Sequence, residues 1–170
     1  MLQLALGPGG MELLFSGAGP LRLLRSTPRR SFLLYPLLVI GFEVLRQRRP
    51  PRLAPAFVPL LAWGYLQYRL VGNYRRRLRE GSVGMERIPD TLIQSGPYAR
   101  TRNPMYLGHL IFLAGLALAF RSRVGWLILL ANIPWFHARV LRDEARLREA
   151  FGTEYERYCA SVPRWIPGAL

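Results

Sequence analysis

The stretch SGPYARTRNPMYLGHL, residues 95–110, decides how the rest of the chain is interpreted. It places two arginines, Arg100 and Arg102, directly before an apolar run that continues to Phe120. Asn103 followed by Pro104 is typical of a helix start, with asparagine at the N-cap and proline at the first helical position. The stretch therefore predicts a helix that begins at a defined point with unpaired backbone N–H groups, which favour a bound carboxylate or phosphate. The alternative is that the arginines only reach lipid headgroups.

Three further apolar blocks accompany this one, so that the four blocks span residues 31–45, 53–72, 105–120 and 124–140. Only the second reaches the roughly 20 residues that cross a hydrocarbon core unaided, and the others must tilt or borrow flanking residues. The last two are separated by residues 121–123 alone, which predicts an antiparallel helical hairpin. The blocks predict an all-α, polytopic integral membrane protein with about four transmembrane helices. A soluble bundle of buried helices is the alternative.

The distribution of charge supports membrane flanks over a nucleic-acid surface. The chain has 170 residues, an apolar content of 51% and a net charge of +14, and its arginines bracket the apolar blocks. Segments 22–30, 75–102 and 139–164 hold four, seven and six arginines, against six in the two loops between them. This excess predicts that both termini are cytoplasmic. We expect residues 1–30 to form a mobile or interfacial segment and residues 31–170 a single domain.

Metal and redox chemistry leave no trace in the sequence. Cys159 is the only cysteine, and the two histidines have no ligand spacing, so we predict neither an internal disulfide nor a metal site. The sequence likewise predicts no nucleic-acid partner, since the positive charge is not gathered in one soluble face.

The segment after the fourth block contains a carboxylate on an apolar helix face. Glu144 shares a face with Val140, Leu147 and Phe151, at helical spacing. An inward carboxylate is costly unless it meets a cation or hydrogen-bond donors, which makes Glu144 a candidate functional residue. Its alternative role is a structural ion pair with an arginine of the loop before residue 103.

The opposite face of this helix carries Arg139, Asp143 and Arg146, which we interpret as an ordinary surface pairing. Gly152 suits a helix end, after which a short second helix carries Tyr155 and Tyr158 on one face toward a membrane interface. We expect the cytoplasmic tail, residues 141–170, to fold back over the ends of the last two membrane helices.

Taken together, three blocks in order resemble the isoprenylcysteine carboxyl methyltransferase family and its phospholipid N-methyltransferase relatives. These blocks are GPYARTRNPMYLG, then an arginine and a glutamate at positions 139 and 144, then FGTEYERYCASVPRWIP. The resemblance runs from about residue 96 to residue 167. It implies a membrane methyltransferase that uses S-adenosylmethionine, held between the start of the third helix and the tail.

The resemblance also assigns residues. It implies a cofactor site formed by Tyr98, Arg102, Asn103, Pro104, Tyr106, Gly108 and Glu144, and catalytic roles for Arg139 and Glu144. The family most often has histidine where this chain has Asn103, and asparagine does not titrate near neutral pH, so a general base at that place is not expected. We expect Arg139 to orient an anionic acceptor and Glu144 to hold the ammonium or ribose of the cofactor.

Several alternatives stay open at this point. The implied acceptor is lipophilic and lies in the bilayer: the carboxylate of a prenylated cysteine, a phospholipid amine or a small lipophilic molecule. An NADPH-dependent enzyme similar to sterol reductases and a non-catalytic small membrane protein are competing interpretations. Gly108 and Gly115 share a helix face, which also fits close helix packing. Packing or interface roles are expected for five further side chains: His109, His137, Trp126, Trp135 and Cys159.

Overall fold

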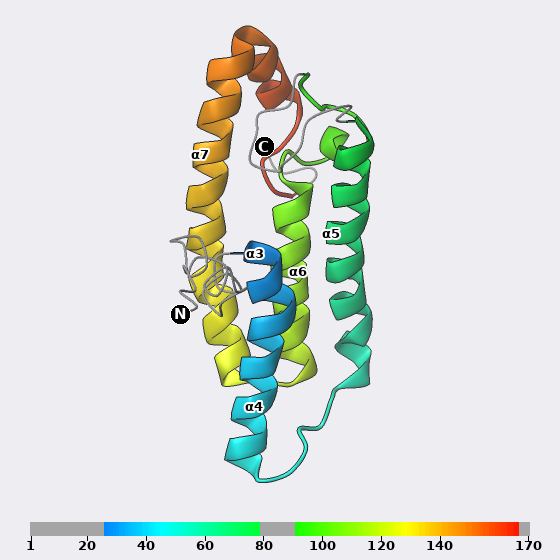
Figure 1. Ribbon diagram of the computed structural model, residues 1–170, viewed down its shortest axis with the longest axis vertical. Coiled ribbons are helices and arrows are strands. Elements are labelled where there is room, and N and C mark those ends of the chain that lie inside the picture. The colour runs from blue at the N-terminus through cyan, green and yellow to red at the C-terminus, as the bar shows by residue number, and fades with distance from the viewer. Residues whose placement is uncertain (1–25, 79–90, 167–170) are drawn as a thin grey trace, which may run out of the picture.

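The computed structural model describes residues 26–78 and 91–166, and these residues are helical with no strand among them (Figure 1). The predicted all-α fold is therefore confirmed for the part of the chain described. The elements in order are α3 (Thr27–Arg29), the π-helical turn η1 (Arg30–Leu34), α4 (Tyr35–Gln47), the 3-10 turn η2 (Pro55–Phe57), α5 (Val58–Leu78), the 3-10 turn η3 (Gly96–Ala99), α6 (Pro104–Ala119) and α7 (Arg123–Ser161).

The predicted helix starts agree with the structure better than the predicted helix ends do. α6 begins at Pro104, as the Asn-Pro pair predicts. Most of the predicted N-terminal segment, residues 1–30, lies outside the described residues, but its last residues from Thr27 onward already belong to the first helix. The apolar block predicted to end at residue 140 and the helical segment predicted to follow it form one helix, α7. α7 continues because the segment LRDEARLREAF contains neither glycine nor proline and keeps helical spacing of its apolar side chains.

Length and composition mark one described helix, α7, as able to cross a membrane, and α6 as a shorter apolar helix. Large apolar side chains are exposed on α4, α5 and α7, among them Leu37, Trp63 and Leu127. The four-crossing topology and the cytoplasmic position of the termini stay predictions.

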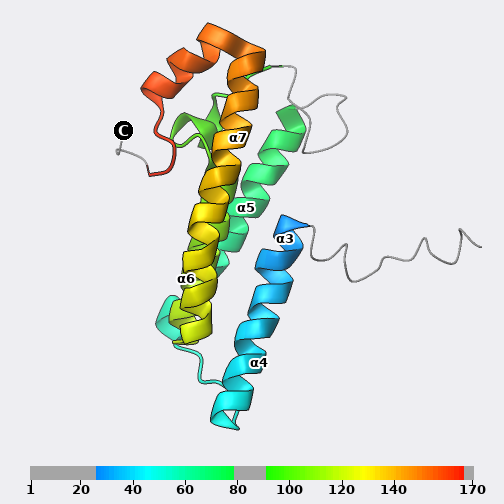
Figure 2. The same cartoon turned by 90° about the vertical axis from the view of Figure 1, so that its left-hand side faces the viewer.

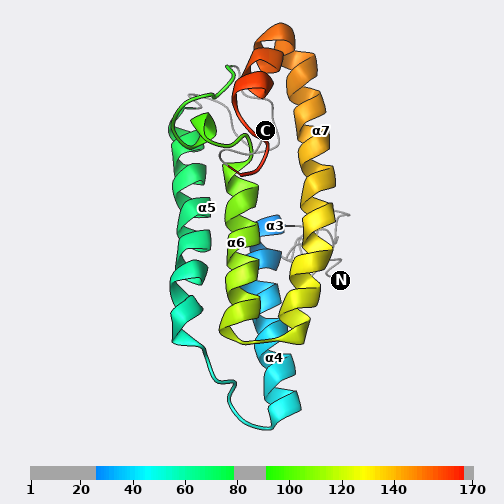
Figure 3. The same ribbon diagram turned by 180° about the vertical axis from the view of Figure 1, so that it is seen from behind.

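α6 and α7 form the antiparallel hairpin that residues 121–123 predict (Figure 3). Arg121 adopts a positive φ of 48°, which closes the turn, and the Ser122 hydroxyl caps α7 by accepting a hydrogen bond from the Gly125 N–H at 3.3 Å. The start of α6 and the second half of α7 consequently lie at the same end of the bundle. Beyond Gly152, where the backbone leaves helical geometry (φ 50°, ψ −124°), the chain turns back over that end (Figure 2).

α5 and α6 approach each other more closely than side chains would allow. A Cβ atom at Gly64 would lie 2.4 Å from the Phe112 nitrogen, and one at Gly115 would lie 2.8 Å from the Leu61 nitrogen. Gly108 faces the same contact, since its Cβ would lie 3.0 Å from the Gly64 oxygen. These glycines set the distance between the two helices, as expected for small residues at a helix interface.

We expect Gly64→Ala to lower the stability of the folded protein by about 2 kcal/mol or more, because the added methyl group meets backbone atoms that cannot move aside alone. Gly41→Ala in α4 is the matched control, since a Cβ there meets nothing within 4 Å and alanine favours the helix. Thermal unfolding in detergent measures both. Equal melting temperatures for the two variants would contradict this account of the α5–α6 contact.

Candidate functional site

A cavity of about 830 Å³ opens at the end of the bundle where α6 begins. Its walls come from the start of α3, from α5, from the segment before α6, from α7 and from the short helix after Gly152. The charged side chains that line it are Arg29, Arg75, Arg102, Arg139, Arg142 and Arg146 against Asp143 and Glu144. The excess of arginine gives the cavity a positive potential, which favours a ligand with an anionic group.

Most of the residues predicted to form the site share this cavity. The lining includes Tyr98, Arg102, Asn103, Pro104, Tyr106, Arg139 and Glu144. Gly108 does not line it, because this residue lies against α5. The described residues contain no group of three His, Cys, Asp or Glu side chains placed to hold a metal ion.

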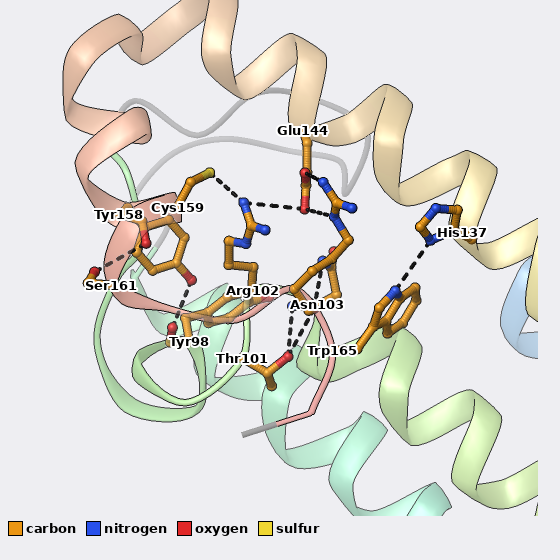
Figure 4. Close-up of polar contacts among 11 residues, drawn as sticks. Tyr98, Thr101, Arg102, Asn103, His137, Glu144, Tyr158, Cys159, Ser161 and Trp165 are labelled. Atoms are coloured by element: carbon orange, nitrogen blue, oxygen red, sulfur yellow. Dashed lines mark hydrogen bonds and ion pairs between the residues drawn. The ribbon is translucent and has the colours of Figure 1, made fainter. Parts of the chain in front are cut away.

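Glu144 is bound by two arginines from outside its own helix (Figure 4). Its side chain is 4% exposed, and both of its oxygens accept hydrogen bonds from Arg164, at 3.0 Å from Nε and 2.9 Å from Nη2. The Arg102 Nη1 atom lies 3.7 Å from Oε1. The hydrogen bonds to Glu144 raise the pKa of Arg164 above its usual value. The buried carboxylate is thus compensated, as an inward charge requires.

Arg164 belongs to the tail segment, residues 162–166, which crosses the approach to α6. The Pro163 carbonyl accepts a hydrogen bond from the Arg102 N–H at 3.0 Å. The Arg164 carbonyl accepts from Thr101 Oγ1 at 3.2 Å and from Asn103 Nδ2 at 3.1 Å. Asn103 holds the N-cap position of α6, but its side chain makes no capping bond and binds the tail segment instead. The start of α6 and the tail segment are therefore fixed to each other.

A second group of polar side chains, Tyr106, Arg139 and Asp143, connects α6 to the neighbouring face of α7. The Tyr106 hydroxyl accepts a hydrogen bond from Arg139 Nε at 2.9 Å and donates one to Asp143 Oδ2 at 2.7 Å. The prediction that Asp143 makes only a surface pairing is wrong, although its weak pair with Arg146 at 4.0 Å exists as well. Successive helix residues point about 100° apart, so a cavity this wide reaches the faces of both Asp143 and Glu144.

The two tyrosines of the short helix after Gly152 were predicted to lie at a membrane interface. The structure buries them inside the protein instead. Tyr155 is fully buried and Tyr158 is 4% exposed, and both line the cavity. The Tyr158 hydroxyl donates a hydrogen bond to the Tyr98 carbonyl at 2.7 Å. Burial raises the pKa of Tyr98, Tyr155 and Tyr158, which keeps all three phenols neutral at physiological pH.

Two contributors to the site escaped prediction from the sequence. Arg164 is the main partner of Glu144. The signal in the sequence was the inward carboxylate of Glu144, which requires a nearby cation. Cys159, expected to serve packing alone, accepts a hydrogen bond from the Arg102 guanidinium. This contact places the cysteine beside the cavity-lining arginine.

One donor of a cavity-lining arginine lacks a partner. The Nε atom of Arg102 is buried and has no hydrogen-bond partner among the described residues. An unpaired buried donor of this kind is costly.

Comparison with known proteins shows a similarity to methyltransferases over less than half of the chain. Residues 78–154 match the phospholipid methyltransferase family. The protein-S-isoprenylcysteine O-methyltransferase of Schizosaccharomyces pombe is 36% identical over 78 residues, which cover 45% of this chain and 33% of that protein. The cobalt-zinc-cadmium resistance protein CzcN of Cupriavidus metallidurans is 28% identical over 78 residues, covering 46% and 36% respectively. The chain thus spans about a third of the length of these relatives, and the resemblance drawn from its sequence motifs is confirmed.

Proposed function

From the similarity of residues 78–154 to phospholipid methyltransferases, we propose that the chain transfers a methyl group from S-adenosylmethionine to a lipophilic acceptor at a membrane interface. We further propose a multi-pass membrane protein with both termini in the cytoplasm. The observation that carries the proposal is the convergence of Arg102, Arg139 and Glu144 on one cavity. These residues come from distant parts of the sequence that match the methyltransferase motifs.

The amino-acid end of the cofactor has a natural place beside Glu144. Glu144 lies between Arg102 and Arg164, so this part of the site alternates positive, negative and positive charge. A ligand that carries an ammonium and a carboxylate is complementary to such a pattern. Arg102 would bind the carboxylate through its guanidinium charge, and Glu144 would accept from the ammonium. S-adenosylmethionine supplies an activated methyl group on a sulfonium, which the ring faces of Tyr98 and Tyr106 suit.

The charge of the cavity favours a carboxylate acceptor over an amine. Six arginines against two carboxylates oppose a protonated amine and attract an anion. Arg139, which donates from Nε to the Tyr106 hydroxyl, lines the cavity, and a guanidinium group matches a carboxylate in charge and shape. A lipophilic molecule that ends in a carboxylate, such as a prenylated cysteine, fits this requirement.

The residues present are sufficient for the transfer itself. Arg139 would orient the acceptor carboxylate, and S-adenosylmethionine held by Arg102 and Glu144 would supply the methyl group together with sulfur as the leaving group. No proton has to be removed from an ionised carboxylate, so the absence of a titrating group at Asn103 does not impede the step. The protein contributes alignment and the exclusion of water.

Titration of the purified protein with S-adenosylmethionine and with NADPH tests this proposal. We expect sub-millimolar binding of S-adenosylmethionine alone, followed by transfer of radiolabelled methyl to an N-acetylated prenylcysteine in preference to phosphatidylethanolamine. Binding of NADPH instead would favour a reductase, and binding of neither would favour a non-catalytic membrane protein. Preferential labelling of phosphatidylethanolamine would overturn the choice of acceptor while leaving the methyl transfer intact.

A further inference from the structure

The indole ring of Trp135 contacts two arginines. The Arg30 Cζ atom is 4.4 Å from the ring centroid, and the Arg139 Cζ atom is 5.7 Å from it. Arg30 belongs to η1 near the start of the described chain, whereas the other two residues lie on α7. Both guanidinium groups are within the distance at which a cation is attracted to an aromatic ring.

The two arginines that contact the ring differ in their hydrogen bonds. The Nε atom of Arg30 is buried and has no hydrogen-bond partner among the described residues. The contact with the Trp135 ring offsets the burial of this charge. Arg139 is bound to Tyr106 through Nε and contacts the ring as well. The orientation of the Arg139 guanidinium therefore depends on where the indole ring lies. Arg30 is well placed to keep the ring there.

The segment around Arg30 contacts the cavity at further points. Residues 26–29 line it, and the ring of Phe32 stacks on His109 with centroids 4.7 Å apart and planes at 24°. His109 itself lines the cavity. Residues 26–29 thus form part of one wall, and Phe32 packs on another lining residue, although this segment lies outside residues 78–154 that match the methyltransferase family. The similarity to that family therefore assigns no function to this segment.

We propose that Arg30 is a positioning residue for methyl transfer, which fixes the guanidinium of Arg139 through the indole ring of Trp135. The inference rests on the proposed function, because it takes Arg139 as the group that orients the acceptor. It assigns the first described helix a role in acceptor binding. Arg30 does not touch the acceptor in this account, since it does not line the cavity and acts on Arg139 through the ring.

The first measurement needs no ligand. The ¹⁵Nε–Hε NMR signal of Arg139, identified by its disappearance in Arg139→Met, reports the position of the indole ring through its ring current. We expect this signal to move in Arg30→Met and in Trp135→Leu, and to move less in Trp135→Phe, which keeps an aromatic face. Arg52→Met, at an exposed position in the loop between α4 and η2, is the control and should leave the signal unchanged.

The second measurement separates positioning from a general loss of structure. We expect Arg30→Met to raise the KM for the carboxylate acceptor roughly tenfold, since a misplaced orienting group weakens alignment, while the Kd for S-adenosylmethionine stays within twofold. Arg30→Lys, which keeps the cation, should recover part of the loss. An unmoved Arg139 signal in Arg30→Met, or an equal rise in KM and in the cofactor Kd, would overturn the proposal. Failure of the wild-type protein to bind S-adenosylmethionine would refute the proposed function instead.

Discussion

Glu144→Ala abolishes binding of S-adenosylmethionine and methyl transfer while the helices remain folded, which is the largest effect we expect from a single substitution. Removal of the carboxylate leaves Arg102 and Arg164 facing each other, and Arg102 is only 10% exposed. Breaking a buried ion pair from one side costs about 3–5 kcal/mol, because the remaining charge has no compensation. The cofactor would also lose the acceptor proposed for its ammonium.

The fold should survive because the tail segment has other attachments. The hydrogen bonds from the Arg102 N–H to Pro163 and from Thr101 to Arg164 do not involve the Glu144 side chain. Calorimetric titration measures binding, and circular dichroism checks the helices. Glu149→Ala, an exposed position on the same helix, is the control. Normal cofactor binding by Glu144→Ala would show that the inward carboxylate serves the fold alone.

Arg139→Met is the second substitution with a large expected effect. We expect kcat/KM for a carboxylate acceptor to fall by about 10²–10³, the loss typical of removing one charged donor from a preorganised site. The cofactor Kd should change little, because Glu144 and Arg102 keep their contacts with each other. Tyr106→Phe removes the hydrogen bonds to both Arg139 and Asp143 and should produce a smaller loss in the same direction.

Steady-state assays with a prenylcysteine acceptor, together with direct titration of the cofactor, measure these losses. Arg123→Met at the far end of α7 controls for the removal of a positive charge from the same helix. If Arg139→Met weakened cofactor binding as strongly as it weakened transfer, Arg139 would belong to the cofactor site and the assignment of roles would be reversed.

The features predicted correctly from the sequence are those that depend on neighbouring residues. The Asn103-Pro104 pair sets the start of α6 through the fixed φ of proline. Residues 121–123 leave no room for anything except a tight turn between antiparallel helices. Gly152 ends regular helical geometry because it adopts a positive φ that other residues avoid.

The features that the sequence could not supply depend on contacts between distant residues. Glu144 and Arg164 are bound only because the chain reverses between them, and helical periodicity carries no record of that reversal. Asp143 accepts a hydrogen bond from Tyr106 of α6. The residue pattern of α7 alone cannot show a partner on another helix. The continuity of α7 through residue 140 was not predicted, since the apolar block and the amphipathic segment after it were treated as separate stretches.

The bend at Gly152 has a consequence for the handedness of the chain. A Cβ atom at this position would meet nothing within 4 Å, so space does not demand glycine. The demand comes from φ at 50° with ψ at −124°, whose mirror image is an ordinary extended conformation for an L-amino acid. A D-amino acid would fit the bend without strain, whereas its L-enantiomer of the same size would not. The direction in which the tail returns to the cavity is thus set at a single residue, where an achiral α-carbon permits backbone angles that an L-amino acid avoids.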